Sequence, residues 1–238
     1  MPITPKNPFK GRQYPGEVIL LAVRWYLRYP LAYLHVSEIL TERGLFIDAS
    51  CIWRWVQAYA PELDKRCRPH LKSTNKSYRV DETYIKVKGK ERYLYRAVDS
   101  IGQTIDFLLN RKARCLRREA LLSKGHSVTG QSVTASGERR QEPGVSSGGG
   151  SYEGRRVPAA PGTPPPVQVL NNIVEQDHRT VKKRVWLAKG YGSFQSAWRT
   201  FQGIEAMNMI RKGRARGVVK GNALGQALFI AELFGIAA

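Results

Sequence analysis

The chain has no long apolar run, few cysteines and few acidic residues. A membrane-spanning helix needs about 18 or more consecutive apolar residues, and no such stretch is present. The N-terminal residues MPITPKNPFKGRQYPGE also lack the apolar stretch of a secretory signal peptide. We therefore expect a protein without a membrane partner.

The cysteines argue against a disulfide framework. Cys51, Cys67 and Cys115 are an odd number and have no paired CxxC spacing. Cys67 and His70 form a CxxH pair, but a structural zinc site needs about four ligands and no second pair lies nearby. Free thiols are the expectation.

The shortage of acids leaves a strong positive charge. Lysine and arginine number 39 against 19 aspartates and glutamates, which gives a formal charge of +20 and a pI near 10.2. Such a chain favours a polyanionic partner, because binding releases the counterions of the polyanion. Nucleic acid is the expected partner.

The stretch from Gly16 to Arg66 has the periodicity of helices. Apolar residues recur at helical spacing up to Pro30, then again over about 32–43, where Gly44 suits a left-handed C-terminal cap. A third helix is expected over about 51–60, capped by Asp48 or Ser50 and ended by Pro61. Three short helices with this turn predict a helix-turn-helix, whose last helix enters the DNA major groove.

On that reading, three polar side chains of the third helix are free to meet bases or phosphates: Ser50, Arg54 and Gln57. The alternative is an ordinary three-helix cap with Trp53 and Trp55 in its core.

From Tyr78 to Asn110 the periodicity changes to that of strands. The segments SYRVDETYIKVKG, ERYLYRAVDS and QTIDFLLN, separated by turn-like residues, predict a three-stranded antiparallel meander. Asp81 has the strand parity of Ile85 and Val87, which predicts that it faces the buried side. A buried carboxylate needs a partner or a metal. The alternative is that Asp81 only caps the frayed start of its strand.

The composition changes sharply over 112–167. Nine glycines, six prolines and seven serines occupy 22 of these 56 positions, and Tyr152 is the only aromatic residue. Such a composition does not build a packed core, so we expect this segment to be disordered or misfolded. Helical periodicity returns near Asn171, again after Ser193 as a predicted N-cap, and over 223–234.

Several segments resemble the short, single-reading-frame DDE transposases of bacterial insertion sequences, a group often found flanking resistance genes. The resemblance covers about 9–111 and 168–238. It is carried by WYLRYPLAY, IWRWVQAYAPEL, RVDETYIKVKGKERYLYRAVDS, LNNIVEQDHRTVKKRV and FQGIEAMNMIRKG.

The resemblance implies an α/β fold in several parts. An N-terminal arm (1–15) and an all-α helix-turn-helix domain (16–70) would precede a ribonuclease-H-like catalytic domain (76–238) of mixed sheet and helices, interrupted by the aberrant segment 112–167. It also implies terminal inverted repeats and target DNA as partners, a homo-oligomer on DNA, and a location in the bacterial cytoplasm with the nucleoid.

The family's catalytic site has three acids, of which this sequence matches two. Asp81 in VDET takes the first position and Glu175 in NNIVEQDH takes the last, as catalytic residues and as ligands of two Mg²⁺ ions. Lys182 and Lys183 stand where the family places basic residues against DNA. Glu175 and Lys182 are two helical turns apart and share a helix face. For Glu175 alone, the alternative is an exposed carboxylate paired with Arg179.

The family's second catalytic aspartate is missing. No aspartate occurs between Asp106 and Asp177, and the glutamates of this interval do not lie in apolar, strand-like runs. Our hypothesis is that 112–167 is read out of frame between two compensating frameshifts; translation of the other frames would test it. A natural flexible insertion is the rival.

Three functions are compatible with this pattern. The chain is a transposase that cuts and joins DNA with metal ions, or a catalytically defective remnant that only binds DNA. A basic RNA-associated protein would explain the charge but not the motifs.

Overall fold

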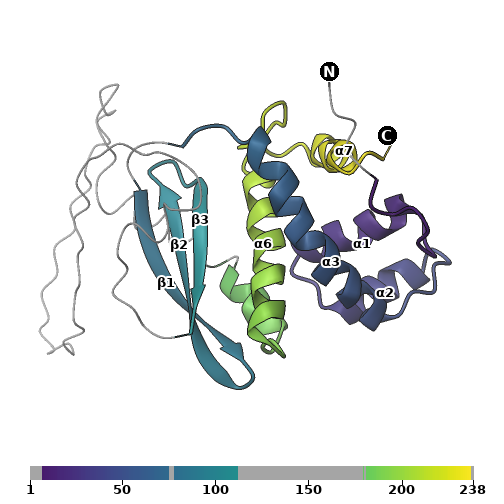
Figure 1. Ribbon diagram of the computed structural model, residues 1–238, viewed down its shortest axis with the longest axis horizontal. Coiled ribbons are helices and arrows are strands. Elements are labelled where there is room, and N and C mark those ends of the chain that lie inside the picture. Colours follow the sequence, from purple (N-terminus) through teal and green to yellow (C-terminus); the bar gives the residue numbers. More distant parts are fainter. Residues whose placement is uncertain (1–6, 75–77, 112–178, 180, 237–238) are drawn as a thin grey trace, which may run out of the picture.

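The structure is a computed structural model that describes residues 7–74, 78–111, 179 and 181–236. It is a mixed fold of helices and one antiparallel sheet. Figure 1 shows helix α6 (Phe194–Arg211) between the sheet on one side and helix α3 (Ala49–Cys67) on the other. Buried side chains from the N-terminal helices, the sheet and α6 form one continuous apolar core. The expected α/β class is thus confirmed at this level.

The N-terminal helices follow the apolar periodicity of the sequence. Helix α1 (Gly16–Arg28) ends just before Pro30, and helix α2 (Tyr33–Thr41) is followed by Gly44, whose φ of +76° is the left-handed turn that the sequence predicts. Asp48 caps α3, because its side chain accepts a hydrogen bond from the Ser50 amide. These predictions are confirmed.

Helix α3 is longer than expected and does not end at Pro61. It continues to Cys67, although Pro61 removes one backbone N–H from the helix interior. The core offsets this loss, since Tyr59, Ala60 and Leu63 on both sides of the proline are buried. A short 3-10 helix, η1 (Arg68–His70), then leads toward the sheet. The prediction that Pro61 terminates the helix was wrong.

The meander is confirmed. Strands β1 (Tyr78–Val87), β2 (Lys90–Asp99) and β3 (Thr104–Asn110) pair antiparallel in the order β1-β2-β3. A register shift at Ala97/Val98 marks a bulge between β2 and β3. Asp81 lies on β1 opposite Arg96 in this register, within the strand rather than at its first residue.

The C-terminal part supplies the central helix. Ser193 caps α6 by accepting from the Ser196 amide at 3.0 Å, as predicted, and helix α7 (Ala223–Leu233) follows. Phe9 packs against Phe234 just after α7, with ring centroids 5.7 Å apart and the rings tilted by 37°. Within the described residues, every helix is too short or too polar to cross a bilayer.

Candidate nucleic-acid interface and catalytic face

The beginning of α3 presents polar side chains to solvent. Ser50 and Arg54 are exposed, and Trp53 between them is 44% exposed. The hydrogen bonds from Ser50 lower the pKa of Asp48, so this N-cap is ionised at neutral pH. Sequence periodicity counted Trp53 among the apolar positions, but it lies at the surface, whereas Trp55 is buried.

Gln57 is not free at the surface. Its side chain is 8% exposed and its Nε2 donates to Thr200 Oγ1 of α6 at 3.0 Å. Gln57 shares the helix face of Ser50 but lies two turns further along, where α6 crosses α3. Helical spacing specifies the face but not where a neighbouring helix covers it, which is why the expected exposure of Gln57 was wrong.

Strand β1 carries the first expected catalytic acid. Thr83, Ile85 and Val87, which follow Asp81 at alternate positions, are all buried. The described part of the chain includes the backbone of Asp81 and its pairing with Arg96, and not its side chain. Glu175, the other expected acid, lies outside the described residues.

A buried ion pair lies behind this part of the sheet. Arg96 of β2 is 0% exposed and Glu205 of α6 is 1% exposed. The guanidinium donates to both carboxylate oxygens, Nε to Oε1 at 2.7 Å and Nη2 to Oε2 at 2.9 Å. This bidentate pair fixes the central strand, at the residue opposite Asp81, to α6.

Sequence reasoning missed this pair, although a signal was present. Glu205 interrupts the apolar run GIEAMNM, and Arg96 interrupts LYRAV. A charge inside an apolar run of each of two elements indicates a buried pair, because an isolated buried charge is too costly to keep.

Lys182 and Lys183 are exposed on a helical segment, 181–187, which lines a groove together with residues of β1. The chain after this segment is hydrogen-bonded to the strand: Tyr191 N donates to Lys86 O and Lys88 N donates to Tyr191 O, both at 2.9 Å. Gly190 permits this approach, because it has a φ of +113° and a Cβ there would lie 3.3 Å from Lys86 O.

A groove separates this helical segment from β1. Its volume is about 480 Å³, and four of its lining residues are Lys86, Lys182, Lys189 and the exposed Trp186. The structure therefore brings Lys182 to the strand that carries Asp81. Three lysines and an exposed indole on one groove are suited to a polyanion with flat bases.

The aspartates of β2 and β3 have structural roles. Asp99 is buried, and its Oδ1 accepts from the amides of Ile101 and Gln103 in the turn between β2 and β3. Asp106 accepts from Arg68 at 3.2 Å. Among the residues that the structure describes, no three His, Cys, Asp or Glu side chains gather closely enough to hold a metal ion.

Comparison with known proteins places this chain in a family. A family model described as a DDE domain matches residues 75–132 and 165–214. The transposase for insertion sequence-like element IS431mec of Staphylococcus aureus strain Mu50 is 35% identical over 212 residues, covering 89% of this chain and 92% of the relative. The transposase for insertion sequence element IS257 in transposon Tn4003, also of Staphylococcus aureus, is 34% identical over the same length. No solved structure matches the chain significantly.

The chain belongs to the DDE transposases of insertion sequences. The resemblance seen in its motifs is thereby confirmed. One boundary moves, however: the family match continues to residue 132, twenty residues beyond the expected break at 112, and resumes at 165. The interval without a match to the family model is 133–164, narrower than the sequence predicted.

Proposed function

We propose that this protein is a DNA-binding transposase copy that has lost strand-transfer activity. One observation carries the second half of the proposal: the family's chemistry uses three acids, and the sequence has no aspartate between Asp106 and Asp177. Two carboxylates, Asp81 and Glu175, supply only part of the ligand set that two Mg²⁺ ions require.

The described acids do not complete that set. Asp99 and Asp106 are engaged in the turn and with Arg68, and Glu205 is held by Arg96. The donors therefore do not fit a two-metal site. We infer that the defect is a replaced segment of a ribonuclease-H-like domain, arising from two compensating frameshifts, so that restoring one aspartate would not restore activity.

DNA binding is supported by the formal charge of +20 and by two exposed surfaces that carry basic side chains. The first is the beginning of α3, with Ser50 and Arg54, as in the recognition helix of a helix-turn-helix. The second is formed by Lys182 and Lys183 beside β1. We propose terminal inverted repeats and target DNA as the partners, a homo-oligomer as the bound form, and the bacterial nucleoid as the place of binding. Such a product would compete with intact copies for DNA ends.

A strand-transfer assay tests the proposal. The full chain is incubated with Mg²⁺ or Mn²⁺ and a labelled DNA end of its own element, and binding is followed by electrophoretic mobility shift in the same samples. The expected result is a shifted complex without joined product. Product that disappears in an Asp81→Asn variant would show that the chain is an active enzyme and overturn the proposed defect.

A matched pair of variants tests the surface of α3. Arg54→Ala should weaken DNA binding and reduce the slope of log affinity against log salt by about 1, because one phosphate contact is lost. Gln57→Ala, three residues along but buried against Thr200, should leave this slope unchanged. If Arg54→Ala and the wild type had equal slopes of log affinity against log salt, Arg54 would not be part of the DNA interface.

A further inference from the structure

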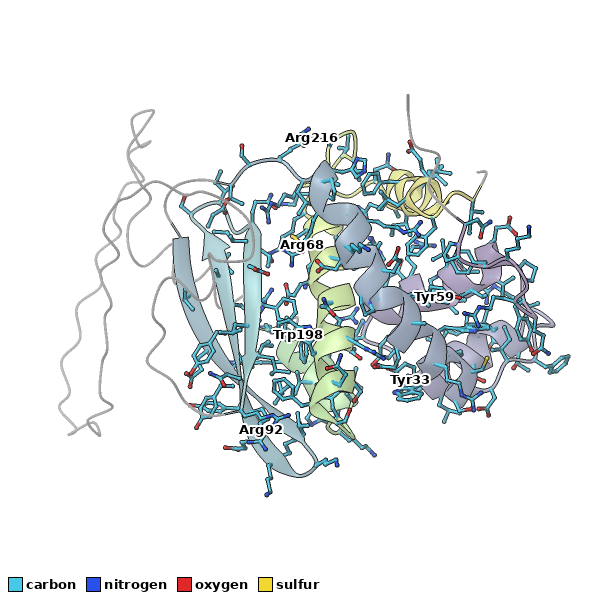
Figure 2. All side chains as sticks on the ribbon, viewed as in Figure 1. Tyr33, Tyr59, Arg68, Arg92, Trp198 and Arg216 are labelled. Carbon is cyan, nitrogen blue, oxygen red and sulfur yellow. The ribbon has the colours of Figure 1, made fainter. Side chains whose placement is uncertain are left out.

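A cavity lies beside the exposed beginning of α3. Its volume is about 320 Å³, and it is enclosed by α3, by the segment between α1 and α2, and by residues 184–204. Figure 2 shows Tyr33, one of its lining residues, near the lower ends of α3 and α6. Trp53 and Leu34, which are 44% and 59% exposed, also line it, so the cavity reaches the surface.

One wall of the cavity holds a buried guanidinium with an unused donor. Arg184 is 7% exposed, and its Nη1 donates to Tyr26 O at 2.7 Å. Among the described residues, no acceptor lies within hydrogen-bond distance of Arg184 Nη2. Burial lowers the pKa of Arg184 to about 10, which still leaves the group charged at neutral pH. A buried N–H of a charged group without an acceptor is costly, and a ligand that supplies one would recover that cost.

The remaining walls are flat, apolar rings with hydroxyl groups at their edges. Tyr26 and Tyr33 are stacked, with centroids 4.0 Å apart and planes 10° apart, and Tyr191 and Trp53 also line the space. Ser196 and Thr200 of α6 add hydroxyl oxygens, whose protons are donated to Ser193 O and Ser196 O. Aromatic walls with a few convergent polar groups suit a planar ring that carries hydrogen-bond acceptors.

We propose that this cavity receives a single unpaired DNA base, stacked on the aromatic walls, with an acceptor atom of the base against the Arg184 guanidinium. The position supports this assignment, because Trp53 lies between Ser50 and Arg54 on the surface proposed to meet DNA. A phosphate is a poorer fit, since Arg184 is the only cationic residue that lines the cavity in the described part of the chain. The inference rests on the proposed DNA binding.

The test compares three labelled duplexes of one sequence by fluorescence anisotropy with the full-length protein. The first is fully paired, the second has one extra unpaired nucleotide, and the third has an abasic residue in place of that nucleotide. The base-containing bulge should bind about tenfold more tightly than the abasic bulge, which corresponds to stacking of one base on aromatic side chains. Equal affinity for the two bulges would overturn the inference, because the kink or the phosphate alone would then explain binding.

Two cavity variants and one matched control identify the site. Arg184→Lys keeps the charge but loses the planar donor pair, and Trp53→Ala removes a wall residue at the surface; each should bring the ratio of the two bulge affinities toward one. Phe46→Ala removes another exposed aromatic side chain, which lines neither this cavity nor the groove beside β1, and should keep the ratio. Cavity variants that retain the tenfold ratio would also overturn the inference.

The same data separate this inference from the proposed function. If all three duplexes bound with equal affinity and binding depended on salt, the proposed DNA binding would stand and only the proposed base site would be excluded. If no duplex bound at low salt, both the proposed DNA binding and the proposed base site would be contradicted.

Discussion

Helix α6 is packed by different chemistry on its two sides (Figure 1). Toward α3 the contact is close and uses small residues: a Cβ built on Gly203 would lie 2.5 Å from the Ala60 Cβ. Toward the sheet, larger side chains fill the space. Trp198, which Figure 2 places between α6 and the sheet, meets Phe107 with ring centroids 4.9 Å apart. Glu205 meets Arg96.

This difference shows which physical property holds α6 to each of its two neighbours. Close helix–helix packing depends on volume, so it tolerates changes only where the neighbours can move. The sheet side depends in addition on one buried charge pair, which is sensitive to the loss of either partner. Substitutions on the two sides should therefore destabilise the protein for different physical reasons.

Glu205→Gln should have the largest effect. It leaves the Arg96 guanidinium buried without a carboxylate, and loss of one partner of a buried pair costs about 3–5 kcal/mol of unfolding free energy. Denaturant unfolding followed by circular dichroism measures the loss. The double variant Arg96→Met, Glu205→Leu replaces the pair by apolar side chains and should be more stable than the single variant. A Glu205→Gln protein as stable as the wild type would show that the pair does not hold the sheet to α6.

Gly203→Ala tests the opposite side of α6. The new methyl group would meet Ala60 and Leu27 at less than 3 Å, and overpacking of this kind costs about 1–3 kcal/mol. Alanine regains about 1 kcal/mol through its higher helix propensity, so a net loss is expected. Gly192→Ala is the control, because a Cβ there meets no atom within 4 Å. Equal unfolding free energies for the two variants would contradict the close contact between α3 and α6.

These two contacts also show what the sequence could and could not predict. Local signals were reliable: the turn at Gly44, the cap at Ser193 and the strands of the meander depend on neighbouring residues and were found. Features that depend on residues far away in the sequence could not be predicted in this way. Pro61 continues a helix because the core holds both of its sides, and Gln57 is covered by a helix about 140 residues later in the chain.

The same division applies to the candidate site. Ser50, Arg54, Lys182 and Lys183 are exposed, as a surface that meets DNA requires, and Lys182 lies beside the strand of Asp81. The cavity around Arg184 was not predictable, because it forms between segments from both ends of the chain. Roles in catalysis for Asp81 and Glu175 stay predictions.

Ser193→Ala should weaken the start of α6. The Ser193 side chain accepts from the Ser196 amide at 3.0 Å, and loss of such a cap costs about 1 kcal/mol. This turn precedes the whole of α6, both the residues that face α3 and those that face the sheet. The thermal midpoint should therefore fall, and the relative effects of substitutions on the two sides should stay the same. Ser193→Asp keeps an acceptor at the N-cap and should retain most of the stability. If the aspartate and alanine variants melted together, the cap would not be contributing.

The smallest effect concerns the cap of α3, and it should depend on pH. Hydrogen bonds from Ser50 hold the pKa of Asp48 below its ordinary value, so the ionised carboxylate stabilises the folded state above that ordinary pKa. This stabilisation is lost as the pH falls through the lowered pKa, because the proton then binds in the folded state as well. Asp48→Asn keeps a capping oxygen that does not titrate. The difference in Tm between wild type and Asp48→Asn should therefore shrink between about pH 5 and about pH 3, and a constant difference across this range would show that the charge of Asp48 adds nothing to the cap.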